Sequence, residues 1–259
     1  MRIEMAFPTT INLKNGWEKK ETSTQRHKLG TRAVTADGRV FYYAKNSSAA
    51  ITPGGKICDG IAAVAAHDMD VAATAAHSVG DTTISLEVPT TDLTANQYKD
   101  GYLIINDGPG QGEVYQIKSH PAHDASADNT VIFTIDDEDG IVTALTTASL
   151  FGVIYNPYTD VKIIDGDGTM TTGPLGVNPM PVTASYYFWL QTSGIASVLS
   201  GAVVAVVGDA VGVSQASNES GAFDLWDVSA NEDTAPIGTA MSIPSVDTDN
   251  QVVMLSIRD

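Results

Sequence analysis

Two histidines and an aspartate lie close together in the segment His120-Pro121-Ala122-His123-Asp124. Imidazole and carboxylate groups at such short range are possible ligands for a divalent metal. The spacing fits no strong zinc motif, however, and the segment follows a strand-like run as a polar loop. We therefore predict no metal ligands here, and we expect His67 and His77 to be exposed loop residues.

Acidic residues gather in two turn-like segments, Asp136-Asp137-Glu138-Asp139-Gly140 and Asp165-Gly166-Asp167-Gly168. Calcium prefers oxygen ligands, but neither segment supplies the bidentate glutamate at the spacing of an EF-hand loop. Asp and Gly are also favoured in tight turns for backbone reasons alone. We interpret both segments as solvated turns and predict neither a metal nor a cofactor.

The chain offers no recognisable catalytic motif. Gly108-Pro109-Gly110-Gln111-Gly112 is glycine-rich, but Pro109 lacks an amide donor and no Lys-Ser/Thr pair follows, as a phosphate loop requires. The single cysteine, Cys58, has no histidine nearby in the sequence, and no Gly-x-Ser-x-Gly elbow occurs. These observations predict a protein without catalytic residues, which is not an enzyme.

The charge balance is strongly acidic. Fourteen Lys and Arg stand against 31 Asp and Glu, a formal net charge of −17, so no direct nucleic-acid partner is expected. The N-terminus has no apolar run behind its positive charge, which argues against a secretory signal. No unbroken apolar run reaches the about 18 residues of a membrane helix, so we expect no membrane partner and synthesis in the cytoplasm.

Half of the basic residues lie at the N-terminus. Residues 1–32 hold seven basic and three acidic residues, about +4, whereas the other seven basic and 28 acidic residues give the remainder about −21. Residues 9–31 are polar and lack a helical or strand period, which predicts an extended arm over residues 1–30 that orders on a negatively charged neighbour. A frayed terminus is the alternative. The residues expected to contact the neighbour are Lys14, Trp17, Lys19, Lys20, Arg26 and Lys28.

From residue 31 onward, short β-like runs alternate with turn residues. Seven Asp-Gly pairs punctuate them, and residues 34–43 read as strand, turn and strand around Asp37-Gly38. The pattern predicts an all-β fold, a β-sandwich or barrel-like domain at 31–150, and a second domain or a continuation of the same sandwich at 151–259. The alanine-rich residues 57–77 are expected to form a short helix or an irregular connection.

Two further segments predict buried strands. Tyr186-Tyr187-Phe188-Trp189 places alternate side chains on opposite faces, so one face belongs to a core and the other must be covered by a second sheet or a neighbouring subunit. The most apolar stretch, residues 195–213, is interrupted by Gly201, Gly208, Asp209 and Gly212. We interpret this stretch as buried strands joined by a turn.

A resemblance rests on residues 29–34 leading into 37–45, residues 100–108 continued by 112–119, and residues 184–192 with the Gly/Val-rich tail. Together these stretches resemble structural proteins of tailed bacteriophages that decorate or cement the capsid. The resemblance implies a β-rich homo-oligomer, a trimer rather than a dimer. It would lie on the capsid surface of the virion, be assembled in the host cytoplasm, and clamp neighbouring major capsid subunits through its arm and β-domain without catalysis.

Two other kinds of function stay open. Another virion component, such as a head or tail fibre, is the structural alternative. A carbohydrate-binding β-sandwich module or enzyme comes from a different class, because three Trp and nine Tyr could line a sugar groove and carboxylates are plentiful.

Overall fold

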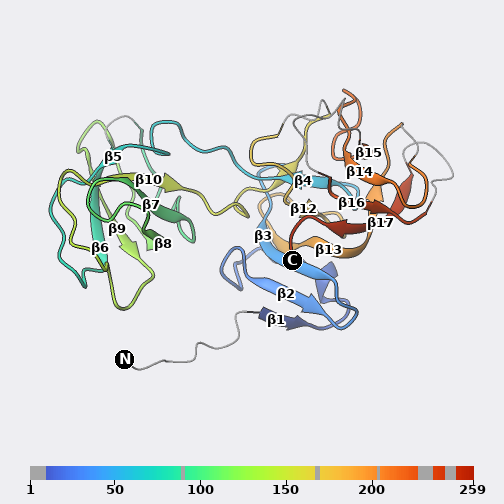
Figure 1. The fold of residues 1–259 in the computed structure, drawn as a ribbon, viewed down its shortest axis with the longest axis horizontal. Coiled ribbons are helices and arrows are strands. Elements are labelled where there is room, and N and C mark those ends of the chain that lie inside the picture. Colours follow the sequence, from blue (N-terminus) through green and yellow to red (C-terminus); the bar gives the residue numbers. More distant parts are fainter. Residues whose placement is uncertain (1–9, 89–90, 167–169, 203–204, 227–235, 243–248) are drawn as a thin grey trace. The chain divides into compact units, whose positions relative to one another are not determined.

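The computed structural model describes residues 10–88, 91–166, 170–202, 205–226, 236–242 and 249–259 (Figure 1). Within these ranges the chain forms strands and one short 3-10 helix, which confirms the predicted all-β class. The elements are β1 (Thr10–Leu13), η1 (Trp17–Lys19), β2 (Arg32–Thr35), β3 (Val40–Lys45), β4 (Ile57–Asp59), β5 (Val71–Ala72), β6 (Thr83–Glu87), β7 (Tyr102–Asp107), β8 (Val114–Ser119), β9 (Thr130–Ile135), β10 (Leu150–Ile154), β11 (Lys162–Ile163), β12 (Gly176–Val177), β13 (Tyr187–Leu199), β14 (Ala210–Val213), β15 (Phe223–Leu225), β16 (Gly238–Ala240) and β17 (Asn250–Ser256).

The chain folds into two compact units. Unit 1 comprises Met1–Ile61 and Pro157–Asp259, and unit 2 is the intervening segment Ala62–Asn156. Unit 2 ends at Asn156, near the domain boundary predicted at residue 150. Residues 31–61, which were predicted to belong with residues 62–150, pack instead with the C-terminal part of the chain in unit 1. The physical reason is that β3 pairs with β13, about 140 residues further along, and no local pattern reveals such a pairing.

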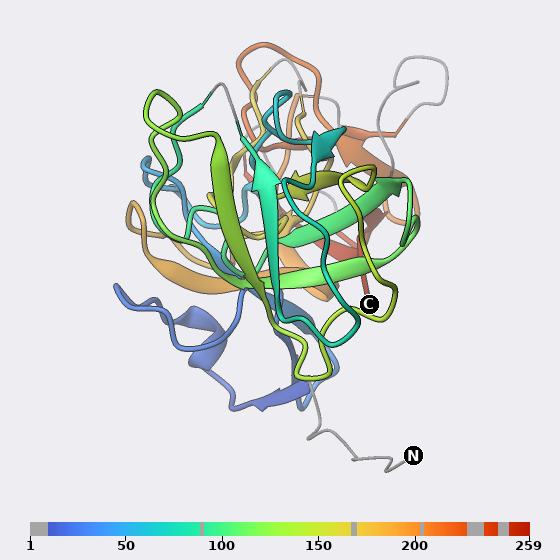
Figure 2. The same ribbon diagram turned by 90° about the vertical axis from the view of Figure 1, so that its left-hand side faces the viewer.

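Unit 2 is built on a six-stranded antiparallel sheet in the order β5-β10-β7-β8-β9-β6. Ala73, just after β5, forms a bridge with Leu86 of β6, so the first and last strands meet and the sheet nearly closes into a barrel (Figure 2). Alternate side chains point inward along each strand, and Leu103, Phe133 and Phe151 are among those fully buried in the interior.

The alanine-rich stretch forms no helix in the part of the chain that the structure describes. Residues 62–70 are turns and irregular backbone, and β5 then pairs with β10. Val71 and Ala73 point into the barrel core, and His67 is buried, contrary to the expected exposed loop position. Pairing and burial therefore outweigh the helix propensity of alanine, which is a weak preference.

Unit 1 holds an eleven-stranded sheet whose main path is β1-β2-β3-β13-β17-β16-β14-β15, with β4, β11 and β12 attached beside it. The long strand β13 organises this sheet, because its first half pairs with β3 and its second half with β17. The change of partner coincides with a register shift between Gln191 and Ser193, next to Gly194, which has a left-handed φ of 86°. Between β2 and β3, Gly38 has a φ of 84°, and the predicted Asp37-Gly38 hairpin is confirmed.

In the aromatic run at the start of β13, Phe188 and Trp189 are covered by the chain itself, whereas Tyr186 and Tyr187 are half-buried. Phe188 and Trp189 point to opposite faces of the strand, yet both are buried in the same core cluster as Phe41 and Leu190.

Of the apolar residues 195–213, the described parts form the end of β13 and the strand β14, and residues 203–204 lie outside the described ranges. The strands were predicted to be buried, but Ile195, Ser197 and Ala210 are exposed, so one face of each strand points outward. No helix in the described ranges has the length and apolarity to span a membrane.

Candidate functional site

The turn around η1 is anchored by a buried glutamate. Gly16 has a left-handed φ of 89°, which reverses the chain before η1. The carboxylate of Glu18 turns inward, accepts the backbone N–H of Gly16 at 2.6 Å, and faces the guanidinium of Arg39, with Oε1 and Nη2 3.4 Å apart. With Glu18 directed inward, the neighbouring side chains of Trp17 and Lys19 are left at the surface.

The segment after η1 is fastened to the sheet of unit 1. Thr22 and Tyr187 exchange two backbone hydrogen bonds of 2.9 and 2.8 Å. The carboxylate of Glu21 accepts both the N–H and the hydroxyl of Thr183, at 2.7 and 2.6 Å, and Gly30 donates its N–H to the carbonyl of Tyr43 at 2.9 Å. These contacts fix the path of residues 21–30.

The prediction of an extended arm over residues 1–30 is therefore wrong for residues 10–30, which pack against the sheet of unit 1. Thr10–Leu13 is a strand that pairs in parallel with Arg32–Thr35, and residues 16–30 are packed as described above. Residues 1–9 lie outside the described ranges. These contacts could not be predicted from the sequence, because the backbone and the carboxylates of Glu18 and Glu21 make them. Such contacts leave no periodic pattern of apolar residues.

The first part of the candidate site is an aromatic pocket of about 330 Å³ in unit 1. The rings of Tyr43 and Tyr187 are stacked, with centroids 5.9 Å apart, and the rings of Tyr43 and Trp189 meet edge-on at 5.0 Å. Apolar aromatic walls with a few polar groups are typical of ligand-binding pockets. The lining residues are Trp17, Lys20, Thr22, Arg26, His27, Tyr43, Tyr187 and Trp189.

The mouth of the aromatic pocket is cationic. Trp17 is 52% exposed, and Nζ of Lys20 lies 5.1 Å from the centroid of its ring, a cation–π contact. The backbone N–H of Arg26 donates to the phenol oxygen of Tyr43 at 3.0 Å, which fixes the backbone of Arg26 at the pocket. Burial lowers the pKa of His27, so the imidazole is neutral at pH 7 and the positive charge comes from Lys20 and Arg26.

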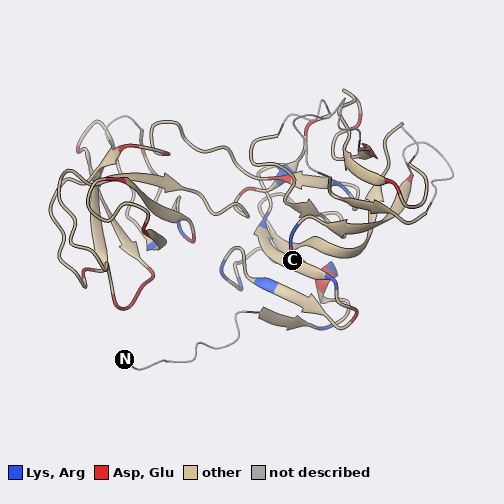
Figure 3. Cartoon of the chain, viewed as in Figure 1, with Lys and Arg blue, Asp and Glu red and all other residues tan. Residues whose placement is uncertain are grey.

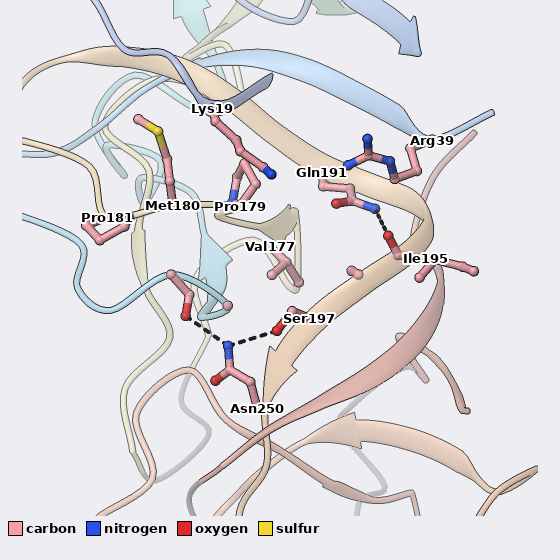
Figure 4. Close-up of a pocket in the computed structure, with 13 residues that line it drawn as sticks. Lys19, Arg39, Val177, Pro179, Met180, Pro181, Gln191, Ile195, Ser197 and Asn250 are labelled. Atoms are coloured by element: carbon pink, nitrogen blue, oxygen red, sulfur yellow. Dashed lines mark hydrogen bonds between the residues drawn. The ribbon is translucent and has the colours of Figure 1, made fainter. Parts of the chain in front are cut away.

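The second part is a groove of about 610 Å³, also in unit 1 (Figure 4). Lys19 and Arg39 lie along one side of the groove, and Ser197 and Asn250 lie opposite them. The amide of Asn250 donates to the hydroxyl of Ser197 at 3.0 Å, and the amide of Gln191 donates to the carbonyl of Ile195 at 2.9 Å. The other lining residues are Gly54, Gly55, Val177, Pro179, Met180, Pro181, Ile195 and Ala196.

Neither lining contains a carboxylate among its described residues, although the chain has 31 acids and only 14 bases. Four cationic side chains line the two cavities; Arg39 is paired with Glu18 and Asp37 behind the groove, so Lys19, Lys20 and Arg26 supply most of the positive charge. η1 with Lys20 contributes to both cavities. We call these two cavities together the cationic site. By contrast, unit 2 holds 14 acidic residues and only two lysines (Figure 3). The cationic site is therefore a local positive region on an acidic protein, suited to an anionic partner.

The structure brings four of the six predicted contact residues to the cationic site. Trp17, Lys20 and Arg26 line the aromatic pocket, and Lys19 lines the groove. Lys14 and Lys28 are exposed but line neither cavity. Sequence reasoning missed the residues supplied by the sheet: Arg39, Tyr43, Tyr187 and Trp189. Their aromatic and basic character was visible, but their proximity to residues 17–26 depends on the β3–β13 pairing.

The histidines considered as metal ligands serve as backbone partners in unit 2. Nε2 of His120 accepts the N–H of Tyr98 at 3.0 Å, and Nε2 of His123 lies 2.9 Å from the carbonyl oxygen of Val88. Within the described ranges, no three or more His, Cys, Asp or Glu side chains are arranged to hold a metal ion. Asp167 and Gly168 of the second acidic segment lie outside those ranges.

Comparison of the chain with family models, with curated proteins and with solved structures gives no match in any of the three.

Proposed function

We propose that this chain is a structural protein of a tailed-bacteriophage virion, which lies on the capsid surface and stabilises it by binding neighbouring major capsid subunits without catalysis. The observation that carries the proposal is the cationic site. Its cavities are lined by Lys19, Lys20, Arg26 and Arg39 and by the exposed Trp17, with no carboxylate among the lining residues that the structure describes. Tryptophan and arginine are the residues most enriched at the energetic centres of protein interfaces.

The site is built in advance of binding. Glu18, Glu21 and the Thr22–Tyr187 bridge hold the segment against the sheet, so little conformational entropy is lost when a partner binds. The partner expected from this chemistry is an acidic protein surface with an apolar group that fits the aromatic pocket. Many weak contacts of this kind on a symmetric shell add up through avidity.

The experiment is co-sedimentation with shells assembled from the major capsid protein of the same genome. The double variant Lys20→Glu/Arg26→Glu should weaken binding at least about tenfold, and binding of the parent chain should fall as salt rises. The matched control is Lys99→Glu/Lys118→Glu, which reverses two exposed lysines of unit 2 and should bind like the parent. Absence of co-sedimentation, or equal binding by both double variants, would contradict the proposal.

A second candidate function is favoured by one specific observation. The aromatic pocket gathers two of the three tryptophans and two tyrosines, and such surfaces also bind sugar rings in carbohydrate-binding modules. In this second function the aromatic pocket binds an oligosaccharide that carries an acidic group, and the protein has no capsid partner there. Binding of an acidic oligosaccharide that is lost in Trp17→Ala, in a protein that does not sediment with shells, would favour this function.

A further inference from the structure

The strand β13 is paired on both edges at Ser193, but only one of these edges stays paired beyond that residue. Ser193 lies opposite Val40 of β3 on one edge and opposite Ser256 of β17 on the other. The pairing with β17 continues to Leu199, whereas the pairing with β3 stops at Ser193. On the β3 edge, the next backbone partner in the described chain is Gly55, whose carbonyl accepts the N–H of Leu199 at 2.8 Å. This edge is therefore open over at most about 20 Å.

The hydrogen bonds of β17 show which groups of β13 face the open edge. The carbonyl of Val252 accepts the N–H of the residue after β16 at 2.8 Å, so Val252 faces β16. In an antiparallel sheet successive residues face opposite edges, so Val253 faces β13, where it lies opposite Ala196. On either side of Ala196, the N–H and C=O groups of Ile195 and Ser197 therefore point away from β17, to the open edge.

The open edge presents two backbone donors. Within the described ranges, neither the N–H of Ile195 nor that of Ser197 has a hydrogen-bond acceptor. The side-chain amide of Gln191 donates to the carbonyls of Ile195 and Ser193, at 2.9 and 3.2 Å, and so takes the place of a neighbouring strand for these acceptors only. Unpaired donors along a strand are a template for pairing with another chain.

The groove of the cationic site follows this edge. Residues 195–197 line the groove, together with Gly55 and Arg39 (Figure 4). The side chain of Lys19 points into it from η1 (Figure 4). Arg39 is already paired with two carboxylates, so Lys19 supplies the charge, and no carboxylate is among the described lining residues. The groove thus offers backbone donors and a cation to one and the same occupant.

We propose that the groove binds an extended acidic segment of a major capsid subunit, which pairs with the open edge of β13 as an added strand. This inference rests on the proposed function and specifies the part of the partner that binds and the way it binds. Carbonyls of the added strand accept the N–H groups of Ile195 and Ser197, and its carboxylates lie beside Lys19. In complexes of this kind the main-chain hydrogen bonds provide affinity and the side-chain contacts provide specificity.

Amide hydrogen exchange, resolved to single residues, tests the pairing in the full chain, free and bound to shells of the major capsid protein. In the free chain, the amides of Ile195 and Ser197 should exchange much faster than those of Ala196 and Val198, which face β17. On the shells, exchange at Ile195 and Ser197 should slow by at least about tenfold. Unchanged exchange at these two amides in shell-bound protein would overturn the inference.

Proline variants test the same pairing by co-sedimentation with the shells. Ser197→Pro removes one of the two groove-facing N–H groups and no hydrogen bond of the sheet, and should weaken binding at least about tenfold. Leu225→Pro is the matched control: it removes an outward N–H of β15, the last strand of the sheet, lies outside both cavities, and should bind like the parent. Equal binding by the two variants would overturn the inference. If Ser197→Pro does not fold, hydrogen exchange decides.

The acidic character of the segment has its own pair of variants. Lys19→Glu should weaken binding, whereas Lys99→Glu, at an exposed lysine of unit 2, should not, and equal binding would overturn the acidic assignment. A parent that binds shells through Lys20 and Arg26 while Ile195 and Ser197 exchange as in the free chain would overturn this inference alone. A parent that does not bind shells would overturn the proposed function as well.

Discussion

The carboxylate of Glu18 and the guanidinium of Arg39 lie 3.4 Å apart at their nearest atoms and join η1 to the hairpin of β2 and β3. Glu18 is buried, whereas Arg39 is partly exposed and also bonds to Asp37, with Nε and Oδ2 2.8 Å apart. The pair therefore holds the turn that presents Trp17 and Lys19 against a rigid part of the sheet.

Replacing Glu18 by Ala should lower the free energy of unfolding by about 1–3 kcal/mol, because the N–H of Gly16 and the guanidinium of Arg39 lose their buried acceptor. Urea denaturation measures the change. Asp160→Asn is the control: it removes an exposed pair with Lys45, whose closest atoms are 3.4 Å apart, and should cost less than about 1 kcal/mol. An equal cost for the two substitutions would contradict this assignment.

Asp59 is the acceptor at the centre of a buried hydrogen-bond cluster in unit 1. Its carboxylate accepts the N–H and the hydroxyl of both Thr171 and Thr172, and the N–H of Gly60 at 2.7 Å. Asp59→Asn should cost about 2–4 kcal/mol, since an amide nitrogen then faces these donors. Thr172→Ser, which keeps the hydroxyl, should cost much less in the same urea experiment.

The same cluster predicts an acid limit for unit 1. Burial alone would raise the pKa of Asp59, but the donors from Thr171 and Thr172 together bring it below its usual value. A carboxyl whose pKa is lower in the folded state stabilises the fold above its unfolded pKa of about 3.9, and this stability is lost as the pH falls further. Between pH 5 and 2, Asp59→Asn should therefore lose less stability than the parent. A parallel decline of the two proteins would refute this.

Between pH 7.5 and 5.5, unit 2 should lose more stability than unit 1, because it holds two buried histidines with a lowered pKa, whereas the one histidine of unit 1 is the half-buried His27. Nε2 of His120 accepts the N–H of Tyr98, so protonation there breaks a buried bond, and burial lowers the pKa of both His120 and His67. Histidines whose folded pKa is depressed stabilise the fold above their unfolded pKa of about 6.5, and this contribution is lost as the pH falls through the folded pKa.

Amide hydrogen exchange checks this pH dependence. Between pH 7.5 and 5.5, after correction for the intrinsic exchange rates, the protection of amides in β7 and β8 should fall more than that of β13 in unit 1, which lies beside the single half-buried His27. Equal changes in the two units would show that the buried histidines do not govern the stability of unit 2.

Cys58 should be unreactive in the native protein. Its side chain is fully buried on β4, and burial raises the pKa of the thiol to about 12, so almost no thiolate exists at pH 8. A thiol reagent should label one cysteine in concentrated guanidinium chloride and none in buffer over the same time. Rapid labelling in buffer would show that the strand opens locally.

The sequence predicted local features of this fold well and its long-range arrangement poorly. The hairpin at Asp37-Gly38, the alternating aromatic run on β13 and the absence of long helices from the described ranges could be inferred, because turns and strands leave periodic signals of a few residues. The packing of residues 10–30 could not, because Glu18, Glu21 and Thr22 find partners up to 165 residues away.

By itself, the sequence determined the all-β class and the concentration of positive charge near the N-terminus, since both follow from residue types and their short-range order. Only the tertiary structure decided that Lys20 and Arg26 meet Tyr43 and Trp189 at one pocket, and that Met254 and Ile195 share one outward face. Both arrangements depend on which strands pair with β13. That choice is made by burial and hydrogen bonding summed over the whole sheet, not by any single segment.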